Sequence, residues 1–140
     1  MAVEKIKRST KQRKLIKEIL VNTKCHPTAD WVYEEARKVL PDISLGTVYR
    51  NLQVLLEENS IQELKYGKSF SRFDGNPDLH YHFVCDCCGE ILDMDVPEQT
   101  ANIIGLAENE LECEIRTHRM EFYGVCPKCL AKAANKAAAL

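Results

Sequence analysis

The sequence predicts an α+β protein in which an N-terminal winged helix-turn-helix precedes a small α/β domain with a four-cysteine zinc site. Three helical patterns and a hairpin pattern fill the first half of the 140 residues, and two Cys-x-x-Cys pairs lie in the second. Charge divides in the same way, because residues 1–72 carry 14 Lys and Arg against 9 Asp and Glu, and residues 73–140 carry 5 against 12. This asymmetry favours one half that faces a polyanion and one that binds cations or another subunit, although an ordinary solvated surface is the alternative.

The first helix is expected from residue 9 or 10 to about residue 24. Ser9 or Thr10 would cap its N-terminus, since a hydroxyl oxygen there can accept a backbone N–H. Apolar residues recur at helical spacing at Leu15, Ile16, Ile19 and Leu20. The face predicted to be exposed carries Lys11, Arg13, Lys14 and Lys17.

Two further helices follow after short breaks. Thr28 is placed to cap a helix that Pro41 ends, and Ser44 is placed to begin another over residues 45–56. The inward positions of the second helix would be Ala29, Val32, Tyr33, Ala36, Val39 and Leu40, and those of the third Leu45, Val48, Leu52, Leu55 and Leu56.

The outward face of the third helix has side chains that can reach phosphates and base edges in a major groove, namely Thr47, Tyr49, Arg50 and Gln53. Lys11 and Arg13 of the first helix are further candidates for contact with DNA. Arg50 is the first choice for a base contact. Residues 61–66 and 69–73 alternate around Gly67-Lys68, which predicts the hairpin wing. A helical scaffold that binds no nucleic acid is the alternative.

The second half predicts a small mixed sheet. The pattern indicates strands at residues 80–84, 90–96 and 113–123, a helix at 97–108 and a short helix at the end. The domain limits expected are 1–73 for the winged helix, 74–79 for a turn-rich hinge and 80–140 for the second domain.

The two Cys pairs predict a structural zinc site made by Cys85, Cys88, Cys126 and Cys129. A domain this small has little core, and four thiolates around Zn²⁺ form a closed tetrahedral cross-link. An iron-sulfur or rubredoxin-like centre and a redox dithiol are the alternatives. Cys87 could replace a neighbouring ligand, whereas Cys25 and Cys113 are expected to be buried small apolar groups.

Histidine and aspartate residues suggest a second metal site. His80 and His82 project to one face of a strand, and Asp93 lies on the next strand. With Asp74 and His26 they would form a nitrogen and oxygen site suited to Fe²⁺, Mn²⁺, Co²⁺, Ni²⁺ or Zn²⁺. Metal binding through His26 would clamp one half of the chain against the other, although surface histidines and turn aspartates are common without a metal.

Localisation and enzyme class are constrained by what the sequence lacks. We expect a cytoplasmic protein with no membrane partner, because there is neither an apolar run of about 18 residues nor an apolar signal core. No Ser-His-Asp set or phosphate-cradling glycine loop is visible, so an enzyme is not predicted.

Several motifs together resemble the ferric uptake regulator family, and especially its peroxide-sensing branch. They are His26-Pro27-Thr28-Ala29-Asp30, Gly46-Thr47-Val48-Tyr49-Arg50-Asn51-Leu52, Ser71-Arg72-Phe73-Asp74, His80-Tyr81-His82, Cys85-x-x-Cys88-Gly89 and Tyr123-Gly124-Val125-Cys126-x-x-Cys129. The resemblance runs in order from about residue 8 to residue 130.

This resemblance implies a homodimeric, metal-dependent repressor that binds double-stranded DNA at a palindromic operator, with a C-terminal dimerisation domain. It implies structural Zn²⁺ on Cys85, Cys88, Cys126 and Cys129. It also implies regulatory Fe²⁺ or Mn²⁺ on His26, Asp74, His80, His82 and Asp93.

The branch of the family depends on few residues. Asp74, where iron sensors tend to have Glu, resembles the peroxide sensors, and Leu79 and Tyr81 make a further family metal site incomplete, so His118 is expected to be a structural polar residue. An iron-sensing repressor is the nearest alternative. The alternative from another class is a small Cys-based redox or electron-transfer protein, which would not bind DNA.

Overall fold

The computed structural model describes residues 2–66 and 70–139. The chain forms two compact units, Met1–Asp78 and Leu79–Leu140, called here the N-terminal unit and the C-terminal unit. The domain limits expected from the sequence, with a hinge at residues 74–79, stay a prediction.

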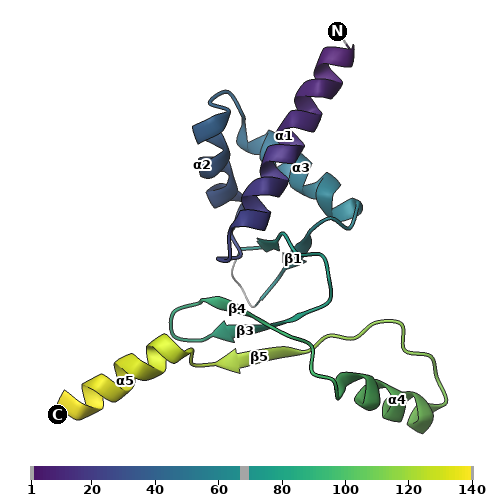
Figure 1. Cartoon of the computed structure of the whole chain (residues 1–140), viewed down its shortest axis with the longest axis vertical. Coiled ribbons are helices and arrows are strands. Elements are labelled where there is room, and N and C mark those ends of the chain that lie inside the picture. Colours follow the sequence, from purple (N-terminus) through teal and green to yellow (C-terminus); the bar gives the residue numbers. More distant parts are fainter. Residues whose placement is uncertain (1, 67–69, 140) are drawn as a thin grey trace. The chain divides into compact units, whose positions relative to one another are not determined.

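In its described residues, the N-terminal unit contains three helices and a two-stranded sheet (Figure 1). The helices are α1 (Ala2–Asn22), α2 (Ala29–Val39) and α3 (Leu45–Glu57). The strands β1 (Gln62–Leu64) and β2 (Arg72–Asp74) pair antiparallel, so that Gln62 lies opposite Asp74. This is the predicted winged helix-turn-helix, and the predicted turn at Gly67-Lys68 lies outside the described residues.

The helix caps confirm two predictions and correct a third. Thr28 Oγ1 accepts a hydrogen bond from the Trp31 N–H (3.3 Å), and Ser44 Oγ accepts one from the Thr47 N–H (3.1 Å). The prediction that Ser9 or Thr10 caps α1 was wrong, because α1 begins at Ala2 and continues through both residues.

All three helices and the sheet contribute to one core. Its buried members are Ile16, Leu20, Ala29, Val32, Ala36, Ile43, Val48, Leu52, Leu55, Ile61 and Phe73. Val39, predicted to face inward, is exposed because it is the last residue of α2. Apart from Leu45, which is half-buried, the remaining predicted inward positions belong to this core or pack against it, so the burial of these stripes holds α3 in place.

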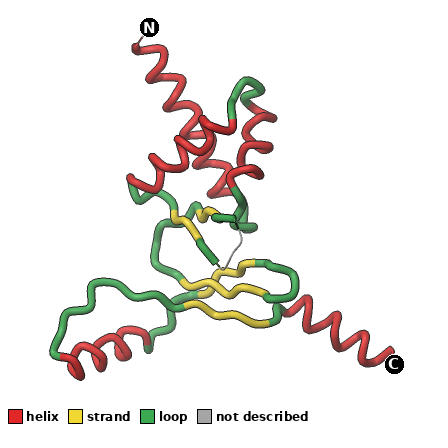
Figure 2. The backbone as a smooth tube through the Cα atoms, turned by 180° about the vertical axis from the view of Figure 1, so that it is seen from behind, coloured by secondary structure: helices red, strands yellow, loops and turns green. Residues whose placement is uncertain are grey.

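The C-terminal unit contains a three-stranded mixed sheet in the order β4-β3-β5. Its strands lie side by side (Figure 2). Strand β3 (Tyr81–Cys85) pairs antiparallel with β4 (Ile91–Met94) and parallel with β5 (Glu121–Gly124). Helix α4 (Thr100–Leu111) precedes β5, and α5 (Pro127–Ala139) follows it. The strand predicted over residues 113–123 begins only at Glu121 and ends one residue later than predicted, at Gly124, because these four residues are the ones that pair with β3.

Among the described helices, none combines the length and the apolar content that crossing a membrane requires.

Candidate metal centres and nucleic-acid surface

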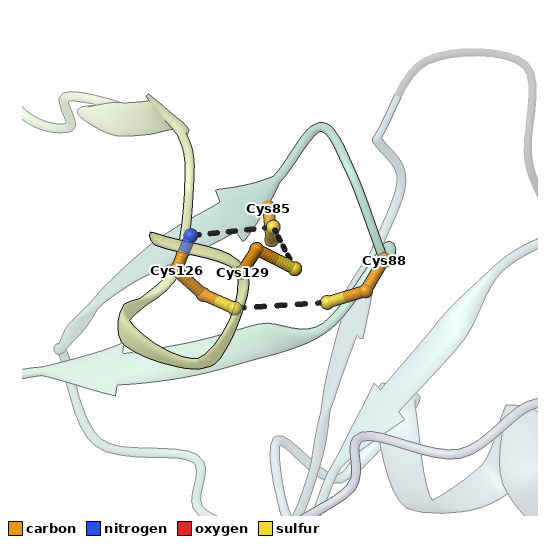
Figure 3. A group of neighbouring side chains, drawn as sticks. All are labelled: Cys85, Cys88, Cys126 and Cys129. Atoms are coloured by element: carbon orange, nitrogen blue, oxygen red, sulfur yellow. Dashed lines mark hydrogen bonds between the residues drawn. The ribbon is translucent and has the colours of Figure 1, made fainter. Parts of the chain in front are cut away.

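Four cysteine sulfurs converge between the end of β3 and the start of α5 (Figure 3). All four lie within 4.8 Å of one another, and the Cys85–Cys129 and Cys88–Cys126 sulfur pairs are each 3.8 Å apart. A tetrahedral Zn²⁺ with Zn–S bonds of about 2.3 Å would place its sulfurs about 3.8 Å apart. The arrangement therefore fits the predicted structural zinc.

Backbone geometry shapes the first of these cysteine turns. Gly89 has φ +75°, which a residue with a side chain rarely adopts, and its N–H donates to the Cys85 carbonyl (2.9 Å). The chain therefore turns back directly after Cys88 to begin β4.

The thiols of this cluster ionise unequally. The Cys126 N–H donates to the Cys85 sulfur (3.3 Å), and this bond, with a second from the Cys88 backbone, lowers the pKa of Cys85 from 9.0 to about 6. The pKa of Cys129 is raised to about 12, first by the side-chain hydrogen bond that Cys129 makes with Cys126 and then by burial. One thiolate thus forms readily, and a metal is required to bring the Cys129 thiol to its anionic form at neutral pH.

Two candidate ligands of the N-terminal unit lie next to each other. His26 Nε2 is 3.3 Å from Asp74 Oδ2, although 48 residues separate them in the sequence. Strand β2 brings them together, because the Phe73 N–H donates to the Pro27 carbonyl (2.9 Å) and Arg72 pairs with Thr28 in an isolated bridge.

Both residues of this pair are held by local backbone constraints. The Asn76 N–H donates to Asp74 Oδ1 (2.9 Å). His26 has φ 49°, a left-handed conformation that side chains other than Gly seldom adopt and that clusters at functional sites.

Three candidate ligands of the C-terminal unit also converge. Asp93 Oδ1 lies 3.2 Å from His80 Nε2 and 3.3 Å from His82 Nε2. His82 and Asp93 are register partners on β3 and β4, and the two imidazole rings have centroids 4.5 Å apart. Each unit therefore presents imidazole and carboxylate donors at short range, a donor set suited to Fe²⁺ or Mn²⁺.

The other cysteines and His118 do not join these clusters. Cys25 and Cys113 are exposed, so the prediction that they are buried apolar groups was wrong, since neither lies on an inward face of a helix or strand. Cys87 is exposed as well, and the cysteine cluster is formed without it. His118 Nε2 lies 2.6 Å from the Tyr81 hydroxyl, which fits a structural polar residue.

The predicted DNA-contacting residues have different environments. Tyr49, Arg50 and Gln53 are exposed on α3, and Lys11 is exposed on α1. Thr47 is half-buried, with its hydroxyl 2.9 Å from that of Ser44, so it is less available. Arg13 is also half-buried, with a buried Nε atom.

Lys17 does not lie on the exposed face predicted for it. It is half-buried, and its ammonium donates to the backbone carbonyls of Ser60 and Gly75. Neither acceptor carries a sequence signal, because a carbonyl is present at every residue, so the pattern along α1 could not reveal these contacts.

A winged helix joined to a sheet with four cysteines defines a class of metal-responsive DNA-binding regulators, and the comparisons with known proteins agree with that class. The family model of the ferric uptake regulator family matches residues 4–123. The chain belongs to the ferric uptake regulator family.

Similar proteins include both named relatives and solved structures. The chain is 42% identical to the peroxide-responsive repressor PerR of Staphylococcus aureus over 125 residues, which cover 89% of this chain and 84% of that protein. It resembles the crystal structure of the Campylobacter jejuni peroxide stress regulator, with TM-score 0.79 and 29% identity over 92% of this chain and 96% of that one. The Helicobacter pylori ferric uptake regulator has the same fold, with TM-score 0.76 and 24% identity over 86% and 80% of the two chains.

Proposed function

We propose that this chain is a metal-dependent transcriptional repressor that binds operator DNA as a homodimer and is inactivated by peroxide. The observation that carries the proposal is the presence of a compact histidine and aspartate donor group in each unit of a winged-helix chain. The 42% identity to a protein named as a peroxide-responsive repressor supports the peroxide signal.

Cys85, Cys88, Cys126 and Cys129 would hold a structural Zn²⁺. Their spacing fits a tetrahedral ion, and the site offers sulfur ligands alone, which leaves no open position for chemistry. The small sheet of the C-terminal unit would gain a cross-link between β3 and α5.

The regulatory Fe²⁺ or Mn²⁺ would take ligands from both units, with His26 and Asp74 from the N-terminal unit and His80, His82 and Asp93 from the C-terminal unit. A ligand set divided in this way would fix one unit against the other, and loss of one ligand would release it. DNA affinity would then depend on metal occupancy.

Bound Fe²⁺ would supply the electron that converts peroxide into a strong oxidant, a reaction for which Mn²⁺ is a poor substitute. This oxidant would form beside the imidazoles of His26 and His80, and an oxidised imidazole is a weaker ligand. Asp74 would leave the bound metal accessible to peroxide, because the Asp side chain is one methylene shorter than that of Glu.

Operator binding would use Tyr49 and Arg50 of α3, with Thr47, Gln53, Lys11 and Arg13 as further contacts. A symmetric dimer presents two equivalent helices, so a palindromic operator should have half-sites about one helical turn, or a multiple of it, apart. A chain that acts on operator DNA works in the compartment that holds the DNA, which is why we propose a cytoplasmic location.

The test is metal analysis combined with operator binding. We expect mild chelation to leave one Zn²⁺ per chain and to remove a second metal, with loss of operator affinity that Fe²⁺ or Mn²⁺ restores. Peroxide should then release DNA from the iron-loaded protein but not from the manganese-loaded protein. Release from both forms would point to cysteine oxidation instead. Operator binding that does not depend on the metal would contradict the proposal.

A further inference from the structure

Lys17 differs from the other lysines of α1 in what its ammonium contacts. Lys11 and Lys14 are exposed, whereas Lys17 is half-buried and donates to the carbonyl of Ser60 and, at 2.8 Å, to that of Gly75. These acceptors lie 43 and 58 residues further along the chain, so one side chain connects three segments of the N-terminal unit. Hydrogen bonds from a charged donor are stronger than neutral ones.

The Ser60 residue that supplies one acceptor carbonyl is joined to the C-terminal end of α3. The Ser60 N–H donates to the Leu55 carbonyl of α3 (2.9 Å), and Asn59 between them has φ 56°. The left-handed conformation of Asn59 and the hydrogen bond from Ser60 to Leu55 together end α3. Lys17 therefore contacts a segment that is hydrogen-bonded to the helix presenting Tyr49 and Arg50.

Gly75 directly follows Asp74, and its backbone lies close to the backbone of α1. A Cβ atom at Gly75 would lie 2.7 Å from both the Leu20 carbonyl carbon and the Val21 nitrogen. These are backbone atoms, which cannot rotate away as a side chain could, so only glycine fits without a shift. The Asp74 carboxylate is thus next to a segment held by a close approach and by the Lys17 hydrogen bond.

We infer that Lys17 and Gly75 are positioning residues for the Asp74 ligand and connect it to the C-terminal end of α3. The inference rests on the proposed function, which assigns Asp74 to the regulatory metal. It extends that function, because a metal that holds Asp74 would restrain the Gly75 segment, and Lys17 would pass this restraint to α3.

The experiment uses the full-length, zinc-loaded chain and measures Mn²⁺ affinity by calorimetric titration, together with zinc content and thermal unfolding. Lys17→Met removes the two hydrogen bonds but keeps the apolar stem, and Gly75→Ala adds the clashing atom. We expect each to weaken Mn²⁺ binding about tenfold or more, the usual effect of losing a residue that orients a ligand, with zinc content unchanged. The gain in operator affinity on adding Mn²⁺ should shrink in parallel.

Two variants serve as controls. Lys17→Arg retains several N–H donors and should restore most of the Mn²⁺ affinity, whereas Lys14→Met changes the same charge at an exposed position of α1 and should bind Mn²⁺ as the wild type does.

Unchanged Mn²⁺ affinity in Lys17→Met and Gly75→Ala would overturn the inference while leaving the proposed function intact. An equal loss in Lys14→Met, or zinc lost together with manganese, would also overturn it, because general destabilisation would then explain the effect. A wild-type chain without an exchangeable metal, or with metal-independent operator binding, would overturn the proposed function itself.

Discussion

Asp74 is the single residue on which the proposed signal depends most. Its Oδ1 is occupied by the Asn76 N–H and its Oδ2 faces His26, so the carboxylate has one defined orientation within the N-terminal unit. A short carboxylate held in this way could bind a metal through one oxygen and leave part of the coordination sphere open.

Replacing Asp74 with Glu tests this reading. We expect Asp74→Glu to keep metal-dependent operator binding but to lose DNA about tenfold more slowly after peroxide, which corresponds to about 1.4 kcal/mol in activation free energy. The measurement is a time course of fluorescence anisotropy with the iron-loaded protein and a labelled operator. Asp78→Glu, an exposed change in the same unit, should behave as the wild type, and an undiminished rate in Asp74→Glu would count against Asp74 as the determinant.

Residue-scale predictions from sequence succeeded where the chemistry is local and failed where it is long-range. Thr28 and Ser44 were identified as caps because a cap bonds an N–H three residues ahead. Ser9 and Thr10 were misread because a hydroxyl residue is also tolerated inside a helix, and nothing nearby marks the earlier start. The role of Lys17 could not be predicted, since both acceptors are distant backbone atoms.

At the scale of elements, the two cysteine turns were predictable from spacing, but their unequal acidity was not. The low pKa of Cys85 depends on an N–H from Cys126, 41 residues away, which only the folded arrangement of β3 and α5 provides. The length of β5 is another such case, because its pairing with β3 begins only at Glu121, opposite His82, and residues 113–120 have no register partner on β3.

The unequal acidity predicts a pH-dependent count of protons released when zinc binds the reduced, metal-free chain. The pKa of Cys85 is about 6, so this thiol is already ionised at pH 7.5 but protonated at pH 5. Zinc binding should therefore release about one proton fewer at pH 7.5 than at pH 5. Calorimetry in buffers of different ionisation enthalpy gives both counts. Cys87→Ser should leave them unchanged, and equal counts at the two pH values would refute the prediction.

At the scale of the whole molecule, the two units differ in the chemistry of the residues they carry. The N-terminal unit places an exposed Tyr49 and Arg50 on a helix fixed by a common core, while the C-terminal unit carries the sulfur cluster. The sequence predicted this division from charge and motif order. It could not predict how each donor pair is assembled, because Asp74 and His26 meet only through the pairing of β2 with the segment before α2.

The C-terminal unit also exposes an apolar helix face, which argues for the proposed homodimer. Ile103, Leu106 and Leu111 of α4 are 54%, 70% and 73% exposed. Apolar side chains gathered on one helix of a unit this small are a typical subunit interface. Because the proposed palindromic operator would need two copies of the DNA-contacting surface, we expect another chain of this protein to cover α4.

Replacing Leu106 with Glu places a charge in that interface and should convert the dimer to a monomer by size-exclusion chromatography with light scattering. Operator affinity should fall about 100-fold or more, since a monomer loses the second half-site and the effective concentration it provides. Zinc content should stay at one per chain, because none of the four cysteines lies on α4. Val39→Glu makes the same change at a 62% exposed position of α2 and should remain dimeric. A dimeric Leu106→Glu protein with full operator affinity would show that α4 is not the subunit interface.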